Sequence, residues 1–148
     1  MDTIANLFSS MENAFRRQHN HCDVPFSKIS FSILHIFYNE GFIQGYQEIH
    51  LKKNKKLLQD NNIVPKRFIR IFFKYNVGGI HGTSLSSFHK LKRISHCGKR
   101  VYISSSSLLS NKKFNGLHTY ILSTSKGIMS DKDARSFNIG GELLGCIQ

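Results

Sequence analysis

Hydrophobic residues recur every three or four positions in two stretches of the first half of the chain, and this spacing predicts two helices. The first spans residues 4–15, with Asp2 or Thr3 as its N-cap. The second follows Ser27, a residue type that caps helices, and Gly41 ends it. Because the second helix is apolar over much of its surface, we expect it to be buried against a sheet.

Three strands are predicted around these helices. A short extended piece covers 21–26, a second strand covers 42–51, and the clearest strand covers 67–75, where apolar and charged side chains alternate. The lysine-rich stretch 52–66 contains Pro65 and is predicted to be a loop. The first half therefore has the order helix, strand, helix, strand, strand.

The second half has shorter segments and many polar turns. Its predicted elements are extended segments at 91–94 and 99–103 around a turn, a helical turn after the serine run 104–107, an Asn-Gly turn at 115–116, a strand at 117–122, a capped helical turn at 130–135 and a closing strand at 142–147. We therefore predict an α+β fold of two small lobes. The expected domains are an α/β domain over 1–75, a Gly- and Ser-rich linker over 76–87 and a β-rich domain over 88–148.

The charge of the chain indicates a polyanionic partner. Its 148 residues carry 21 Lys and Arg against 9 Asp and Glu, a formal net charge of +12, and the sequence pI is about 9.9. A pI above ~9 is typical of nucleic-acid binders, since a polyanion relieves the self-repulsion of the cations. No apolar run approaches the ~20 residues of a membrane-spanning helix, and no long basic amphipathic helix suits a membrane surface. Nucleic acid is therefore expected, and a membrane is not.

The cysteines and histidines favour neither a disulfide scaffold nor a metal site. Three cysteines without C-x-x-C spacing fit a reducing compartment. Two stretches combine histidine with cysteine, 19–22 and 96–97, but they form one site only if distant segments meet, whereas structural zinc sites have closely paired ligands. We expect no metal and no cofactor.

The residues with the most informative chemistry lie at 117–127. An apolar run there ends in Ser123-Thr124-Ser125, followed by Lys126 and Gly127. Hydroxyls donate and accept hydrogen bonds, so this loop can bind base edges, ribose hydroxyls or phosphates, and Gly127 lets a ligand approach the backbone. A purely structural turn is one alternative. A hydrolase with a nucleophilic serine is another, but the chain has no G-x-S-x-G motif, and no acid–His pair can be assigned to these serines.

Two weaker signals accompany this loop. Basic and apolar residues alternate over 91–94 and 99–102, which fits either an ordinary solvated sheet face or a strip of cations along a phosphate backbone, with Tyr102 available to stack or hydrogen-bond. Glu142 follows a pair of glycines. It either pairs with an arginine or accepts a hydrogen bond from a base amino group.

The order of short motifs along the chain carries a family resemblance. The motifs are D-x-I-A-N-L, P-x-S-K, N-E-G-F-I, L-K-R-I-S-x-x-G-x-R-V-Y, N-G-L, L-S-T-S-x-G-I-M-S-D-K-D-A-R and G-G-E-L-L. Together they cover nearly the whole chain, which resembles bacterial-type small-subunit ribosomal protein S eight. The resemblance implies an α/β lobe followed by a mostly β lobe, no catalytic activity, and binding to the central domain of small-subunit rRNA early in assembly.

The resemblance also implies which residues contact RNA. The loop of Ser123, Thr124, Ser125, Lys126 and Gly127 meets an irregular rRNA helix with splayed bases, the kind of site at which proteins bind RNA bases. Flanking positions are Glu142 and Tyr102, the phosphate contacts are assigned to Arg93 and Arg100, and the N-terminal contacts with RNA backbone are assigned to Thr3, Asn13 and Lys28.

We therefore expect a structural constituent of the small ribosomal subunit, with the central domain of its rRNA and neighbouring small-subunit proteins as partners, and with no small-molecule substrate. The alternative is a free regulatory RNA binder that represses its own mRNA. The chain has 12 Phe and no Trp, and together with frequent Ile, Lys and Asn this is typical of an AT-rich genome. That bias, and a start without a signal or transit segment, favour a mitochondrial ribosome over a plastid or bacterial one.

Overall fold

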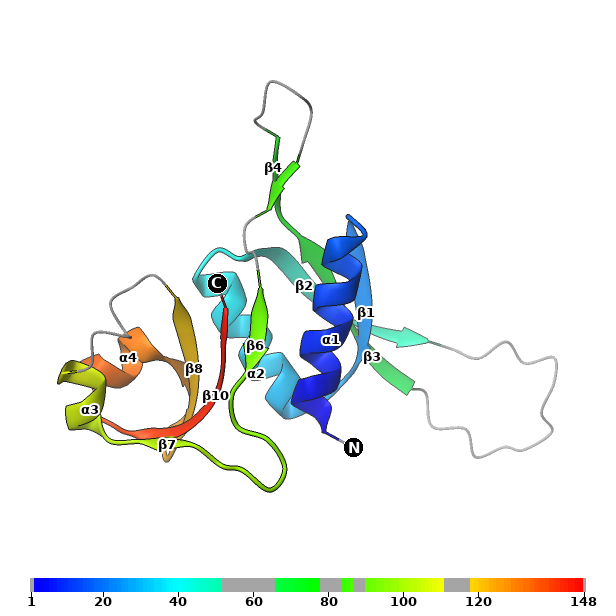
Figure 1. The fold of residues 1–148 in the computed structure, drawn as a ribbon. Helices are drawn as coiled ribbons and strands as arrows, with labels where there is room; N and C mark the ends of the chain where they lie inside the picture. Colours follow the sequence, from blue (N-terminus) through cyan, green and yellow to red (C-terminus); the bar gives the residue numbers. More distant parts are fainter. Residues whose placement is uncertain (1, 52–65, 78–83, 87–89, 111–117, 148) are drawn as a thin grey trace, which may run out of the picture.

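The computed structural model of the chain describes residues 2–51, 66–77, 84–86, 90–110 and 118–147. It has two parts lying side by side, an N-terminal α/β part and a C-terminal mostly β part (Figure 1). The predicted α+β class is confirmed. The predicted Asn-Gly turn at 115–116 and most of the loop at 52–66 lie outside the described residues.

The first part has the predicted order of elements. These are α1 (Thr3–Arg16), β1 (His21–Pro25), α2 (Lys28–Asn39), β2 (Ile43–Leu51) and β3 (Lys66–Phe73). The three strands form an antiparallel sheet in the order β1-β3-β2.

Both helices begin at the predicted caps. The Asp2 carboxylate accepts hydrogen bonds from the N–H groups of Ile4 and Ala5, and the Ser27 hydroxyl accepts one from the Ser30 N–H. These acceptors satisfy N–H groups that have no partner within the helix. Gly41 follows α2 with a φ of +79°, which an L side chain rarely adopts.

The third strand ends earlier than the sequence predicts, and the predicted linker contains strands. β3 stops at Phe73, and Tyr75 opens β4 (Tyr75–Val77), which pairs antiparallel with β5 (Ser84–Ser86). These short strands have too little apolar alternation to distinguish them from a Gly- and Ser-rich linker. The domain boundaries themselves stay a prediction.

The second part is a sheet built around its last strand. Its elements are β6 (Leu91–Arg93), β7 (Tyr102–Ile103), α3 (Ser105–Ser110), β8 (Thr119–Thr124), β9 (Gly127–Ser130), α4 (Asp131–Ser136) and β10 (Gly141–Ile147). β8 lies along one edge of β10, and β6 and β7 follow one another along the other edge. Because β6 and β7 both run antiparallel to β10, the turn predicted between them does not reverse the chain. The chain leaves the sheet after β6 and returns to the same edge of β10 as β7.

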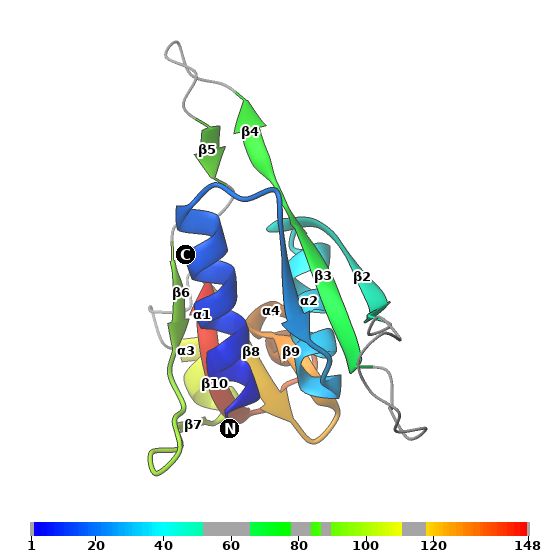
Figure 2. The same cartoon turned by 90° about the vertical axis from the view of Figure 1, so that its right-hand side faces the viewer.

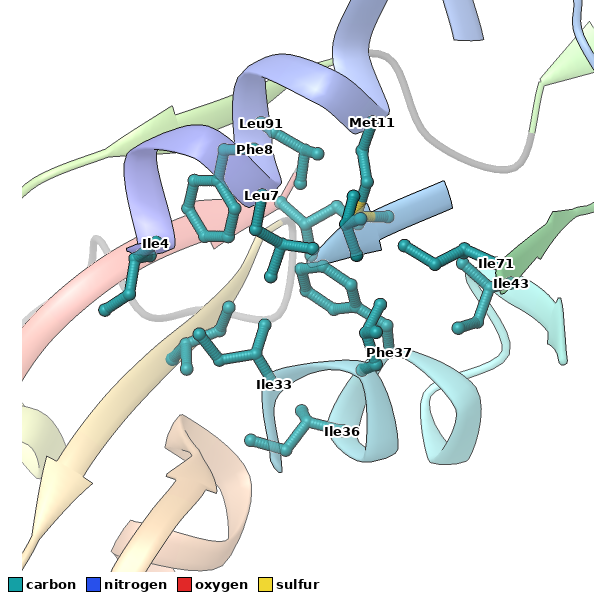
Figure 3. Packing of buried hydrophobic residues seen from close by; sticks show 14 of the residues in the cluster. Ile4, Leu7, Phe8, Met11, Ile33, Ile36, Phe37, Ile43, Ile71 and Leu91 are labelled. Atoms are coloured by element: carbon teal, nitrogen blue, oxygen red, sulfur yellow. The ribbon is translucent and has the colours of Figure 1, made fainter. Parts of the chain in front are cut away.

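One hydrophobic core joins the two parts. α1 contributes Leu7 and Met11, α2 contributes Phe37, and β6 of the second part adds Leu91 (Figure 3). Ile147 of β10 belongs to the same cluster. Ion pairs also cross the junction, from Arg93 to Asp2 and from Lys132 to Glu40. The two parts therefore hold one another in place. Within the described ranges, no helix is both long and apolar enough to cross a bilayer.

Candidate nucleic-acid interface

The predicted polar loop is a tight hairpin turn between β8 and β9. Ser123 and Thr124 still belong to β8, and only Ser125 and Lys126 lie in the turn. The Thr124 hydroxyl accepts a hydrogen bond from the Lys126 N–H at 3.1 Å and donates one to the Gly127 carbonyl at 2.9 Å. Thr124 thus holds the turn together, and the exposed Ser125 and Lys126 side chains are presented to solvent.

Gly127 is required by its backbone conformation. Its φ is +114°, outside the range that L side chains readily adopt, whereas a Cβ at this position would meet no atom of the described residues within 4 Å. The described residues therefore leave room for the predicted approach of a ligand to the backbone at Gly127.

The structure aligns three of the predicted site residues in one row. Glu142 of β10 pairs with Ser123 of β8 on one side and with Tyr102 of β7 on the other. Directly paired residues project to the same face of a sheet, so the hydroxyl, carboxylate and phenol lie next to one another beside the turn. Tyr102 is 71% exposed and its ring is therefore open to a ligand.

Glu142 forms the ion pair that was one of its two predicted roles. Its Oε1 accepts a hydrogen bond from Nη1 of Arg100 at 2.7 Å. Partial burial favours the protonated acid, but hydrogen bonds from Arg100 and Ser95 and the charges of Arg100 and Arg93 outweigh it, so the pKa of Glu142 lies below its usual value. The side chain is a carboxylate at neutral pH, oriented by Arg100. Assignment of Arg100 to phosphate stays a prediction.

Arg93 is close enough to Glu142 to lower its pKa, but its guanidinium pairs with a different carboxylate. Its side chain is only 10% exposed, and its Nη2 pairs with Oδ2 of Asp2 at 3.0 Å across the junction of the two parts. Its Nε donates to the Ser95 carbonyl. This arginine has a structural role in the protein, and its assignment to RNA phosphates stays a prediction that this geometry does not favour.

The predicted N-terminal contacts fall at different ends of the molecule. The N-terminal ends of α1 and α2, which carry Thr3 and Lys28, lie at the same end as β7 and the β8–β9 turn in both views (Figures 1 and 2). The C-terminal end of α1, where Asn13 lies, is at the opposite end. One RNA surface can therefore include Thr3 and Lys28 together with the turn, whereas Asn13 requires a more extended contact.

Sequence reasoning missed two residues at this site. Phe137 directly follows α4 and lies under the Lys126 ammonium, whose Nζ is 4.8 Å from the ring centroid. Gly141 lies so close to β8 that a Cβ there would be 2.3 Å from the Ser123 carbonyl oxygen. The sequence does carry a signal for Phe137, which is an apolar residue between the polar Ser136 and Asn138. The close contact of Gly141 depends on which strands pair, so the sequence carries no signal for it.

The described cysteines and histidines do not form a metal site. Among the residues that the structure describes, no group of three His, Cys, Asp or Glu side chains is arranged to hold a metal ion. Burial, with a smaller effect of the Asp23 charge, raises the pKa of Cys22 to about 12, so this thiol stays protonated.

The lowered pKa of Glu142 predicts a pH dependence of stability. A carboxyl group whose pKa is lower in the folded state adds stability above its unfolded pKa, near 4.5, and this contribution disappears as the pH falls through the folded value. Glu142→Gln should therefore be less stable than wild type at neutral pH, and the difference should narrow in acid. Urea unfolding at both pH values tests this. An unchanged difference in acid would contradict the inferred ion pair with Arg100.

The chain matches known proteins along nearly its whole length. A family model described as Ribosomal protein S8 matches residues 2–147. Small ribosomal subunit protein uS8 of Geotalea daltonii is 37% identical over 143 residues, which is 97% of this chain and 94% of the relative. The uS8 protein of Dictyoglomus thermophilum is 35% identical over 97% of this chain and 94% of the relative. That of Mycoplasmopsis pulmonis is 36% identical over 99% of this chain and 96% of the relative.

The fold and the site define a basic, two-part α+β protein that presents a hydroxyl-rich hairpin turn at one end of its second sheet. The matches extend over nearly the full length of both this chain and its relatives. The chain belongs to the ribosomal protein S8 family.

Proposed function

We propose that this chain is a non-catalytic constituent of the small ribosomal subunit that binds the central domain of small-subunit rRNA and supports its assembly. Family membership over residues 2–147 supports the ribosomal role. The observation that carries the RNA-binding role is the row of Ser123, Glu142 and Tyr102 beside the exposed β8–β9 turn. Neighbouring small-subunit proteins are its other partners.

Different groups at this end supply selectivity and affinity. The Ser125 hydroxyl is exposed and has no hydrogen-bond partner among the described residues, so it is free to bond with a base or a ribose. The Glu142 carboxylate accepts from a base amino group while it stays paired with Arg100, since a carboxylate has several acceptor sites. Exposed cations such as Lys126 and Lys28 bind phosphates irrespective of sequence.

Ser125→Ala tests this division. We expect the variant to bind the rRNA helix more weakly by about 1–3 kcal/mol, because its RNA partner loses a hydrogen bond, and to bind a scrambled duplex as wild type does. Filter binding or calorimetry with both RNAs measures the effect. Ser110→Ala is the matched control, since that hydroxyl bonds to the Ser106 carbonyl within α3. Equal losses on both RNAs would contradict a selective role for Ser125.

The same proposal places the protein on the ribosome of a mitochondrion. The support is compositional, since 12 Phe and no Trp accompany frequent Ile, Lys and Asn. Immunodetection in sucrose gradients of isolated mitochondria, after a salt wash, tests both parts of this placement. Co-sedimentation with the organellar small subunit is expected. Detection only as free protein would favour a regulator of its own mRNA instead.

A further inference from the structure

An exposed aromatic ring stands beside the candidate RNA-binding turn without a role in the core. Phe137 is 56% exposed, although phenylalanine is normally buried. Its ring lies 4.8 Å from Nζ of Lys126, which belongs to the turn itself. An apolar surface left in water beside a cation is suited to a ligand that has both a flat apolar face and a negative charge.

The backbone fixes the position of this ring. The Phe137 N–H donates to the Asp133 carbonyl at 3.0 Å, and the N–H groups of Asn138 and Ile139 also donate to carbonyls of α4. Asn138 then adopts a φ of +53° and turns the chain towards β10. Beyond it, Gly140 packs so closely that a Cβ would lie 2.4 Å from the Ile103 carbonyl oxygen. The backbone that carries the ring is therefore anchored on both sides, so a ligand need order only the side chain.

A nucleotide has both a flat apolar face, which suits the Phe137 ring, and a negative charge, which suits the Lys126 ammonium. Every base has a π face, and exposed aromatic side chains stack on bases that are not paired. The Lys126 ammonium, held over the ring by its quadrupole, lies where it can neutralise a nearby phosphate. A regular RNA duplex does not offer such a face, because its bases are stacked on one another.

We propose that Phe137 and Lys126 form a stacking subsite for one unpaired base of the bound rRNA. This inference rests on the proposed function and extends it, since it adds an aromatic contact to the hydroxyl turn. In this arrangement Ser125 and Glu142 hydrogen-bond to the RNA, the Phe137 ring stacks on a base, and Lys126 contacts the phosphate.

A structural role for the ring makes a different prediction. If Phe137 only positions Lys126, its loss affects all RNAs that contact the turn, whichever of their bases are present. If Phe137 stacks on a base, its loss and the loss of that base remove the same contact. The two effects then do not add.

The experiment combines protein variants with base-deleted RNA. The probe is a central-domain rRNA helix containing its unpaired bases, together with versions in which each unpaired nucleotide in turn is abasic. The protein variants are wild type, Phe137→Leu, which keeps an apolar side chain without the ring, and Phe137→Trp. The control is Tyr38→Ala, which removes an aromatic side chain of α2 that is 51% exposed.

We expect Phe137→Leu to weaken binding of the intact helix by about tenfold, and one abasic helix to weaken wild-type binding by a similar factor. Phe137→Leu should bind that abasic helix no more weakly than wild type does. Phe137→Trp and Tyr38→Ala should bind the intact helix as wild type does. The salt dependence should not change in Phe137→Leu, since no charge is removed.

Two results would overturn the subsite. One is wild-type affinity of Phe137→Leu for the intact helix. The other is an equal loss on the intact helix and on every abasic version, which would leave Phe137 only the positioning of Lys126. Failure of the proposed function is distinguishable from both, because wild type would then show no preference for the intact helix over a scrambled duplex.

Discussion

Gly141→Ala should destabilise the protein strongly and disable the proposed RNA site at the same time. The added Cβ would lie 2.3 Å from the Ser123 carbonyl oxygen and 3.0 Å from the Ser123 carbonyl carbon. These are backbone atoms, so β8 and β10 must separate to make room. We expect a loss of about 3 kcal/mol in the free energy of unfolding, at the upper end of the cost of overpacking.

Gly141→Ala should lose more RNA-binding affinity than its smaller folded fraction alone explains. Separation of β8 from β10 breaks the row of Ser123, Glu142 and Tyr102, so the folded fraction of Gly141→Ala should bind the rRNA helix at least about tenfold more weakly. Urea unfolding gives the stability, and binding is measured at a temperature at which the variant is folded. Gly45→Ala is the control, because within the part of the chain that the structure describes a Cβ there meets no atom within 4 Å. Similar stability of the two variants would contradict the strand packing described.

Asp2→Ala should have the second large effect, on stability alone. The Asp2 carboxylate caps α1 through two N–H groups and also pairs with Arg93, whose side chain is only 10% exposed. Loss of an N-cap costs about 1 kcal/mol. An unpaired charge at a mostly buried position costs more, so we expect a total of about 3 kcal/mol in the free energy of unfolding.

Two further variants separate these contributions. Asp2→Asn keeps an oxygen that caps α1 but removes the charge, so it should retain part of the stability. Glu12→Ala breaks an ion pair with Arg16, which is 71% exposed, and should cost less than about 0.5 kcal/mol. Thermal and urea unfolding of the three variants gives the comparison. If Asp2→Ala were no less stable than Glu12→Ala, the junction of the two parts would not depend on this carboxylate.

The local features of the fold were predictable from the sequence because their causes lie within a few residues. Asp2 and Ser27 cap helices whose first turns they precede, and Ser130 caps α4 by accepting from the Asp133 N–H. The apolar spacing of residues 4–15 likewise determined which face of α1 is buried. In these cases pattern and structure agree.

Contacts between distant segments were not predictable from spacing. Nothing near Arg93 in the sequence indicates that its partner is Asp2, or that Gly141 must fit against Ser123. The turn between β6 and β7 was located correctly, but both strands pair with β10, which comes last in the chain. The antiparallel pair of β4 and β5 falls within the predicted linker, because strands so short and weakly patterned are not predictable from the sequence.

The candidate site was located partly by chemistry and partly by resemblance. A run of hydroxyl residues before Lys126 and Gly127 was visible without any relative, whereas Glu142 and Tyr102 were singled out chiefly by their family positions. The structure brings these two together with Ser123, and it shows Glu142 paired with Arg100. Neither the chemistry of the loop nor the family resemblance indicated Phe137.

The most direct test of the central claim is the affinity of the purified protein for a central-domain helix of small-subunit rRNA, compared with a scrambled duplex of the same length, over a series of salt concentrations. The account predicts tight binding to the true helix, with a preference that persists as salt weakens both complexes, because hydrogen bonds and stacking are screened less than phosphate contacts. Equal affinity for both RNAs, falling equally steeply with salt, would contradict it.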